Sequence, residues 1–407
     1  MNRLIIKRNV KIDLWDWLLV LGLVLSPMTS LRIWKVGPGE VLCALWTIRY
    51  LNFKKIIFSD VFKFFTVFII CISAGTLIGV YKEPQETDPA GILTWVYLGY
   101  IACMIYSGLR KRNREYIEHL FFIGAVVTTC WHFFLYLYSI TINRSFFGIG
   151  LWYGGSRYAG GGTNPHQVAL LMCGLAVYFL RNVFTKKHAL FSLVMAACCF
   201  MVEMATQSST GLASVVAACL TFMYVFTARL GTSKKLRTGI IIVETLLIIL
   251  AVIIFYAPLF EFVFNWIASD KNGLGRFAIF SHIGEVFTES PVFGLGTGAH
   301  SETLSGSQLE FHNTYLEVLA AGGVAALLVL IWFTFRICKK TSADAYFYPL
   351  IVQLYTFGLA GFGMRRLPYW WLLMFVILTA EKKRTELMAE YDSTQTGDDI
   401  LSDAPME

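Results

Sequence analysis

A histidine and an asparagine, His312-Asn313, stand at the start of a long apolar run in the segment EFHNTYLEVLAAGG. An imidazole can exchange a proton near neutral pH, as general acid–base chemistry requires. The same pair also suits the beginning of a helix, where Asn313 would cap the first turn. Glu317, slightly further into the run, is a possible supporting group. From these residues alone, a catalytic role and a capping role both stay open.

Two other segments contain arginines in unusual surroundings. Arg157 lies among five glycines in YGGSRYAGGGTNPHQ, and Arg276 opens the amphipathic stretch RFAIFSHIGEVF. Glycines let a ligand approach the backbone closely, and the N–H groups at a helix start favour anions. The alternative for the first segment is a flexible loop with Asn164 as the cap of a helix that begins at Pro165-His166. The alternative for Arg276 is an ion pair within its own loop.

A further pair of cations, Arg365-Arg366, precedes the aromatic segment LPYWW. Guanidinium groups can hold a diphosphate through bidentate hydrogen bonds without a metal. A histidine beside that diphosphate could deprotonate an attacking hydroxyl. The sequence contains no DxD, HExxH or GxxxxGK[ST] motif and no Cys/His cluster, so we expect neither a metal nor another cofactor. This set of residues is the minimum for glycosyl transfer from a lipid diphosphate.

The composition indicates where these residues act. Of 407 residues, 56% are hydrophobic and 15% are charged, which is too apolar for a soluble protein of this size. Apolar runs long enough to span, or nearly span, a bilayer recur about twelve times, so we expect an all-α, polytopic membrane protein. The predicted spans are Leu14–Leu31, Val36–Tyr50, Val61–Tyr81, Ala90–Leu109, Ile117–Ile140, His166–Leu180, His188–Thr206, Thr210–Thr227, Gly239–Phe264, Thr314–Phe335, Ala345–Met364 and Pro368–Ala380.

The lysines and arginines support this arrangement. With about twelve spans, most of the 34 basic residues fall in loops on the side that both termini share. Positively charged loops stay in the cytoplasm, so we expect both termini there. The net charge of +7 then reflects topology, and nucleic acid is not an expected partner.

The chain divides into a membrane domain, residues 1–385, and an acidic tail, residues 386–407, that we expect to be disordered in the cytoplasm. Two outward-facing loops are long, at residues 141–165 and 265–313, and the second precedes the tenth predicted helix. Ordered loops of this length usually contain functional residues. The candidate residues lie within or beside these outward-facing segments.

Three blocks of the sequence resemble the O-antigen ligase and polymerase superfamily, bacterial inner-membrane glycosyltransferases of GT-C-like architecture. The blocks are SRYAGGGTNPHQVALLM, LGRFAIFSHIGEVFTESPVFGLGTG and FHNTYLEVLAAGGVAALLV. The early segment SPMTSLRIWKVGPGE is also similar to the start of many members. Together they span most of the chain.

The resemblance implies a donor glycan linked to undecaprenyl diphosphate and a metal-independent, inverting transfer on the periplasmic face. It implies that Arg157 and Arg276 bind the donor diphosphate and that His312 is the essential histidine. The acceptor would be a second glycan or lipid A–core, and a flippase and a chain-length regulator would be further partners beside the bilayer itself.

One position departs from the family pattern. Members often have an arginine after the tight turn in a T-x-S-R pattern, whereas this chain has Ser209 in TQSSTG. This departure, the short outer loops and the glycine-rich arginine loop favour a polysaccharide polymerase of O-antigen, capsule or exopolysaccharide. An O-antigen ligase is the alternative, since His312-Asn313 followed by Gly323 fits ligases too. A transporter of lipid-linked glycans is a third hypothesis, although it would place polar residues at mid-membrane.

Overall fold

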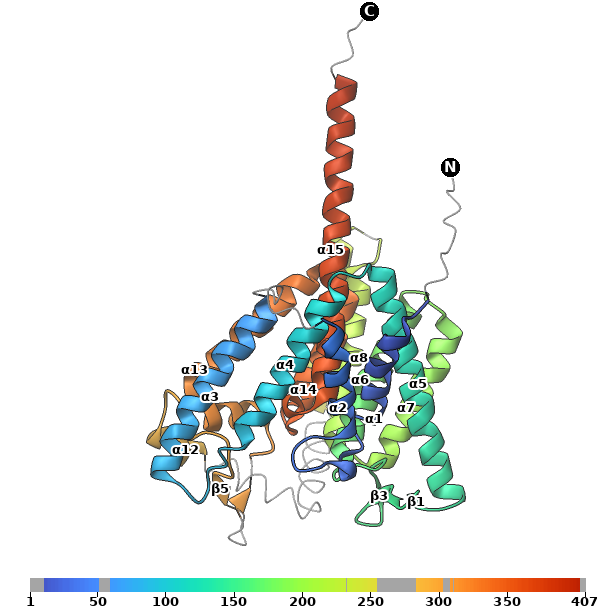
Figure 1. Cartoon of the computed structure of the whole chain (residues 1–407). Coiled ribbons are helices and arrows are strands. Elements are labelled where there is room, and N and C mark those ends of the chain that lie inside the picture. The colour runs from blue at the N-terminus through green and yellow to red at the C-terminus, as the bar shows by residue number, and fades with distance from the viewer. Residues whose placement is uncertain are drawn as a thin grey trace, which may run out of the picture.

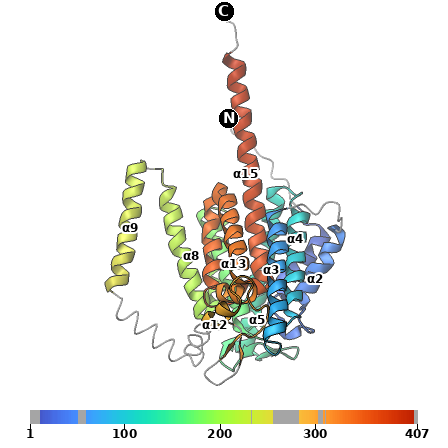
Figure 2. The same cartoon turned by 90° about the vertical axis from the view of Figure 1, so that its left-hand side faces the viewer.

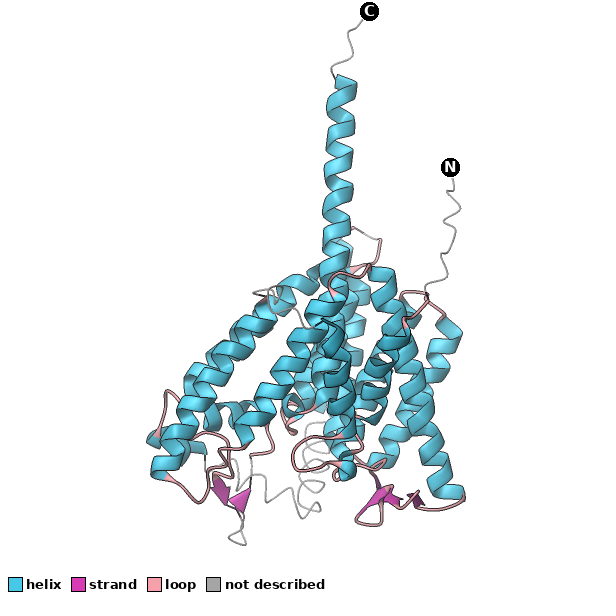
Figure 3. Ribbon diagram, viewed as in Figure 1, coloured by secondary structure: helices cyan, strands magenta, loops and turns pink. Residues whose placement is uncertain are grey.

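The computed structural model describes residues 11–50, 59–231, 233–254, 283–302, 308–309 and 311–402. Over these residues the chain is mostly helical, and its few short strands lie in loops at one end of the helix bundle (Figure 3). The mostly helical character expected from the sequence is therefore confirmed.

The helices follow the apolar runs closely. Each predicted span overlaps a helix, and in the described part of the chain seven helical segments are long and apolar enough to cross a membrane. The structure thus supports a multi-pass membrane protein, while the total number of spans stays a prediction. The α-helices are α1 (Trp17–Leu25), α2 (Pro38–Thr47), α3 (Asp60–Lys82), α4 (Gly91–Leu109), α5 (Arg114–Thr141), α6 (Pro165–Phe184), α7 (Ala189–Thr206), α8 (Ser209–Ala228), α9 (Lys234–Ile254), α12 (Ile283–Glu289), α13 (Thr314–Thr341), α14 (Tyr348–Phe357) and α15 (Leu367–Ser402).

Three helices are shorter than their predicted spans. Pro27 stops the first, because proline lacks the N–H that the next turn would need, and α1 ends at Leu25. The second begins only at Pro38, in the first-turn position that suits proline. The eleventh, α14, ends at Phe357 where glycine follows. The apolar pattern alone does not predict these helix ends, because they are set by proline and glycine.

The helices run roughly side by side, with loops at two opposite ends (Figure 1). The start of α1 and the projecting part of α15 lie at one end. The opposite end contains α12 and six short strands: β1 (Ser145–Phe146), β2 (Ile149–Gly150), β3 (Trp152–Tyr153), β4 (Arg157–Tyr158), β5 (Ser301–Glu302) and β6 (Gln308–Leu309). We call this end the hairpin side.

The C-terminal segment differs from its expected form. Helix α15 continues to Ser402 and projects well beyond the bundle (Figure 1), so residues 386–402 of the predicted disordered tail are helical. The first half of α15 is buried among the other helices. Helix nucleation is the costly step and propagation is cheap, so a buried helical start explains how polar residues beyond it continue the same helix.

Helix α6 and the first half of α15 form the centre of the bundle. Most of the apolar stretch of α6 is buried, and large rings fill the space around α15. Phe121 stacks on Phe375 with ring centroids 3.7 Å apart, and Phe64 stacks on Phe333 at 4.3 Å. Helix α9 stands at the edge beside α8 (Figure 2), where Thr227 donates a hydrogen bond of 2.7 Å to Glu244.

Helix α13 is broken at Gly323, which has φ 64° and ψ −165°. In a continuous helix the carbonyls of residues 320 and 321 would accept from the N–H groups of residues 324 and 325. Here the two carbonyls instead accept from Leu295 and Gly296, at 2.7 and 3.1 Å. The two N–H groups donate to the carbonyls of Pro291 and Val292, at 3.0 and 3.1 Å. Segment 291–296 therefore supplies hydrogen-bond partners for these four backbone groups.

Glycines make this close backbone approach possible. A Cβ on Gly323 would lie 2.2 Å from the Val292 carbonyl, and one on Gly294 would lie 2.2 Å from the Ala320 carbonyl oxygen. On the other face, a Cβ on Gly79 of α3 would lie 1.8 Å from the Leu295 carbonyl oxygen. Segment 291–296 is thus inserted between α3 and α13, and the GLGTG and AAGG motifs are complementary halves of one packing contact.

Gly323→Ala is expected to destabilise the protein. The new Cβ would overlap Val292, and the positive φ adds backbone strain of about 1–3 kcal/mol. We expect the apparent Tm of the detergent-solubilised protein to fall by roughly 5 °C or more. Gly150→Ala is the matched control, because a Cβ there meets nothing within 4 Å. Equal Tm values for the two variants would contradict the proposed role of the break.

Candidate functional site

Two small hairpins in the loop between α5 and α6 place Arg157. Strand β1 pairs with β2, and β3 pairs with β4, where Tyr153 faces Arg157 across a turn that contains Gly154 and Gly155. The next residue, Tyr158, is fully buried and donates to the His132 carbonyl at 3.1 Å. Because Tyr158 is fixed in the core, it also fixes the backbone position of its neighbour Arg157, which is half-buried.

The guanidinium of Arg157 lies against the tight turn between α7 and α8. Its Nε donates to the Thr206 carbonyl at 3.1 Å, and Nη2 lies 3.4 Å from the Gln207 carbonyl oxygen. Gln207 has a φ of 51° and its side chain returns a bond of 3.4 Å to the Ser156 carbonyl. The hairpin and the turn therefore hold each other, and one edge of the guanidinium is oriented by backbone carbonyls.

The same turn contacts His166. Nδ1 of His166 lies 2.8 Å from the Ser208 hydroxyl, which also caps α8 by accepting from Gly211 N–H. Asn164 caps α6 by accepting from the His166 N–H at 2.9 Å, as the alternative interpretation of this loop predicts. Three residues from the glycine-rich segment thus gather around the start of α6 and the α7–α8 turn.

A buried carboxylate lies beneath this turn. Glu203 of α7 is 2% exposed, and Oε2 accepts a hydrogen bond of 3.2 Å from the Thr206 hydroxyl. A carboxyl group at this depth in an apolar bundle is costly unless it has a partner, and the Thr206 hydroxyl is the partner of Glu203.

His312 lies at the start of α13 in a left-handed conformation, with φ 51°. The residues on both sides are fixed. The Phe311 N–H donates to Glu317 Oε2 at 3.0 Å, and the Phe311 side chain is buried. Asn313 caps α13 by accepting from the N–H groups of Tyr315 and Leu316, at 2.9 and 3.1 Å. The capping role expected for Asn313 is therefore confirmed, and Glu317 supports the backbone just before His312.

The loop after α14 contacts both the start of α8, beside the turn that holds Arg157, and the start of α13, beside His312. Asn313 Nδ2 donates to the Leu359 carbonyl at 2.7 Å, and the Thr314 hydroxyl donates to the Gly361 carbonyl at 2.8 Å. From the other side, the Thr210 hydroxyl at the start of α8 donates to the Ala360 carbonyl at 3.3 Å. The starts of α8 and α13 therefore meet on one loop, residues 358–361, at the hairpin side.

The remaining predicted arginines fall into two cases. Arg365 and Arg366 lie a few residues after this loop, and the Arg365 guanidinium lies 5.2 Å from the centroid of the Phe362 ring. Both are half-buried. Arg276 lies outside the described residues.

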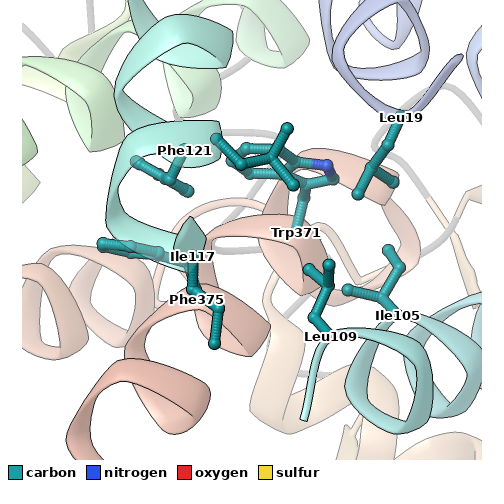
Figure 4. Close-up of a pocket in the computed structure, with 8 residues that line it drawn as sticks. Leu19, Ile105, Leu109, Ile117, Phe121, Trp371 and Phe375 are labelled. Carbon is teal, nitrogen blue, oxygen red and sulfur yellow. The ribbon is translucent and has the colours of Figure 1, made fainter. Parts of the chain in front are cut away.

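Two apolar cavities lie elsewhere in the bundle. One has a volume of about 10 Å³ and is lined by aliphatic and aromatic side chains such as Leu19, Ile105, Phe121, Trp371 and Phe375 (Figure 4). A cavity this small and apolar stays dry. The other, of about 280 Å³, lies between α2 and α4. None of the predicted site residues lines either cavity, so we regard both as packing features.

The structure also brings together three residues that the sequence analysis missed. Glu83, Glu86 and His300 each place a possible metal-ligating atom within 4.8 Å of the others. Burial and the neighbouring Glu86 carboxylate raise the pKa of Glu83 to about 7. No motif marks this cluster, because its histidine lies in a loop far along the chain from the two glutamates.

The Asn313 cap gives a direct test of how the start of α13 is held. Asn313→Ala removes the acceptor for two N–H groups and the bond to Leu359, and we expect it to lower the free energy of unfolding by about 1 kcal/mol. Asn313→Asp keeps the capping oxygen and loses only the Leu359 contact, so its Tm in detergent should fall less. A larger fall for Asn313→Asp than for Asn313→Ala would contradict this account.

A comparison with known protein families identifies part of the chain. Residues 194–331 match the family model described as O-Antigen ligase. No curated protein and no solved structure matches the chain. The matched segment extends from α7 into α13 and contains His312, Glu317 and Gly323, whereas Arg157 and Arg365 lie outside it. Residues 194–331 are thus an O-antigen ligase family domain, which confirms the resemblance of the chain to the O-antigen ligase and polymerase superfamily.

Proposed function

We propose that this chain is a GT-C-like glycosyltransferase that polymerises a glycan linked to undecaprenyl diphosphate. The observation that supports it most is the match of residues 194–331 to the O-antigen ligase family, because this segment contains His312, which lies on the hairpin side as Arg157 does. In this proposal about twelve spans lie in the bacterial inner membrane. Both termini are cytoplasmic, and the hairpin side faces the periplasm.

His312 acts on the acceptor. A hydroxyl of the acceptor glycan attacks the anomeric carbon of the donor, and the imidazole takes the hydroxyl proton. The new glycosidic bond forms as the bond between the anomeric carbon and the diphosphate oxygen breaks. The configuration at that carbon inverts, and undecaprenyl diphosphate leaves. Glu317 and Asn313 support this step by fixing the backbone on either side of His312.

Arginines stabilise the leaving diphosphate. As the bond to the sugar breaks, negative charge grows on the diphosphate, and a guanidinium fork meets two of its oxygens at once. Arg157 is suited to this role because the carbonyls of Thr206 and Gln207 already fix its orientation. Arg276 is its proposed partner, and Arg365 and Arg366 border the loop that contacts Asn313. The chemistry itself uses no metal and no cofactor.

The acceptor defines the type of enzyme. In a polymerase the acceptor is a second glycan, whereas in the ligase alternative it is lipid A–core. The family description favours ligase-type chemistry in general, and Ser209 together with the glycine-rich loop around Arg157 favours the polymerase. A flippase that delivers the donor and a chain-length regulator are the proposed protein partners.

His312→Ala is expected to abolish glycan transfer while the amount of membrane protein stays normal, because no other group then removes the acceptor proton. The measurement is the surface polysaccharide of a deletion strain complemented with each variant. Single repeat units on the surface anchor would identify a polymerase, and long chains left on undecaprenyl lipid would identify a ligase. Neither defect in the deletion strain would refute both functions.

His188→Ala is the matched control for His312→Ala. His188 also has a positive φ, of 49°, but precedes α7 at the end opposite the hairpin side. It should retain wild-type transfer. Full activity of His312→Ala would exclude His312 from the mechanism.

Arg157→Lys is expected to lower transfer at least ~10-fold, since lysine keeps the charge but not the bidentate fork. Donor dependence of the rate in membranes would show the loss as weaker use of the lipid-linked glycan. Arg144→Lys is the control from the same loop, where Arg144 donates to the Gly155 carbonyl and covers the Trp152 ring. Equal rates for both variants would remove Arg157 from the proposed diphosphate site.

A further inference from the structure

The segment that follows the α13 insertion is tied to the turn after α3 by backbone hydrogen bonds. The N–H of Ala299 donates to the Glu86 carbonyl at 3.0 Å, and the N–H of Asp88 donates to the Thr297 carbonyl at 2.6 Å. Thr87 and Gly298 form an isolated bridge between these bonds. The two segments are therefore held in a fixed register, so side chains that project from them have defined positions.

His300 projects from one of these segments into a protected position. Its side chain is 2% exposed. Nε2 lies 3.1 Å from the Gly296 carbonyl oxygen. A carbonyl can only accept, so Nε2 must hold the hydrogen. In the neutral ring this leaves Nδ1 without a hydrogen.

Nδ1 of His300 lies 2.9 Å from Glu83 Oε2. A bare ring nitrogen and a carboxylate oxygen both present lone pairs, so a proton or a cation must lie between the two atoms. Two ligands of a tetrahedral Zn²⁺, each about 2.1 Å from the metal, would be separated by ~3.4 Å. The contact between Nδ1 and Oε2 would therefore widen by about 0.5 Å when the cation replaces the shared proton.

The Glu86 carboxylate completes the cluster, with ligand atoms of all three residues within 4.8 Å of one another. Glu86 is three residues after Glu83 in the turn that follows α3, and its N–H donates to the Glu83 carbonyl at 3.2 Å. The nearby cation Lys82 directs its Nζ to the Glu289 carbonyl at 2.7 Å. Two carboxylates thus converge on one imidazole, in surroundings that raise the pKa of Glu83.

We propose that Glu83, Glu86 and His300 bind one divalent transition-metal cation, of which Zn²⁺ is the best match, and that this cation joins the turn after α3 to the loop before α13. A histidine whose second ring nitrogen donates to a backbone carbonyl is the usual arrangement of a metal ligand. One nitrogen and two carboxylate ligands suit Zn²⁺ better than Mg²⁺ or Ca²⁺, which prefer oxygen alone. The proposed role is structural and separate from glycan transfer.

The test is metal binding by the full-length protein in detergent. After dialysis against EDTA, Zn²⁺ is added back and bound metal is measured by mass spectrometry alongside the apparent Tm. We expect about one Zn²⁺ per chain, and a Tm raised by roughly 5 °C at a hundred times Kd. Mg²⁺ at the same concentration should leave the Tm unchanged.

Two variants each remove one of the proposed metal ligands. Glu86→Gln and His300→Gln should each lower Zn²⁺ affinity at least ~10-fold, and Glu86→Gln tests the proposal even if His300→Gln fails to fold. Glu285→Gln is the control, because Glu285 is exposed on α12 outside the cluster.

Absence of stoichiometric Zn²⁺ in the wild type, or wild-type affinity in Glu86→Gln, would overturn the proposal. A Tm that responds to pH but not to Zn²⁺ would also overturn it and assign a shared proton instead. Metal content is measured without any transfer assay, so these outcomes are independent of the proposed function.

Discussion

The exchange of backbone hydrogen bonds at the break in α13 determines how the hairpin side is built. A helix interrupted within an apolar bundle would leave peptide groups without partners, each costing several kcal/mol. Segment 291–296 supplies four replacements, and this places a loop segment between α3 and α13. Because α13 begins only nine residues before Gly323, the same exchange also fixes where His312 emerges.

A second constraint joins the parts of the candidate site that are far apart in sequence. Loop 358–361 offers backbone carbonyls to side chains from the starts of α8 and α13. The α7–α8 turn in turn holds Arg157 and His166. Polar contacts between helix starts and irregular backbone therefore link the arginine loop to the histidine, while apolar packing holds the helices beneath them.

Local signals in the sequence predict much of this structure. Apolar runs mark the helices, and Asn164 and Asn313 mark two caps, because these features depend on neighbouring residues. The sequence does not predict the break at Gly323, since its cause is a segment almost thirty residues earlier whose glycines fit against it. The sequence does not predict the cluster of Glu83, Glu86 and His300 either, because its histidine lies far along the chain from the two glutamates. The placement of Arg157 beside Thr206 likewise depends on how the hairpin folds back onto the α7–α8 turn.

The conformation of His312 has a consequence for how this position would change under selection. A left-handed backbone is most easily occupied by glycine or asparagine, so selection for stability alone would replace the histidine. The chain nevertheless has an imidazole there, bordered by a buried phenylalanine and a capping asparagine. Under the proposed function, the imidazole at 312 offsets this conformational cost, and relatives with glycine at this position would lack glycan transfer.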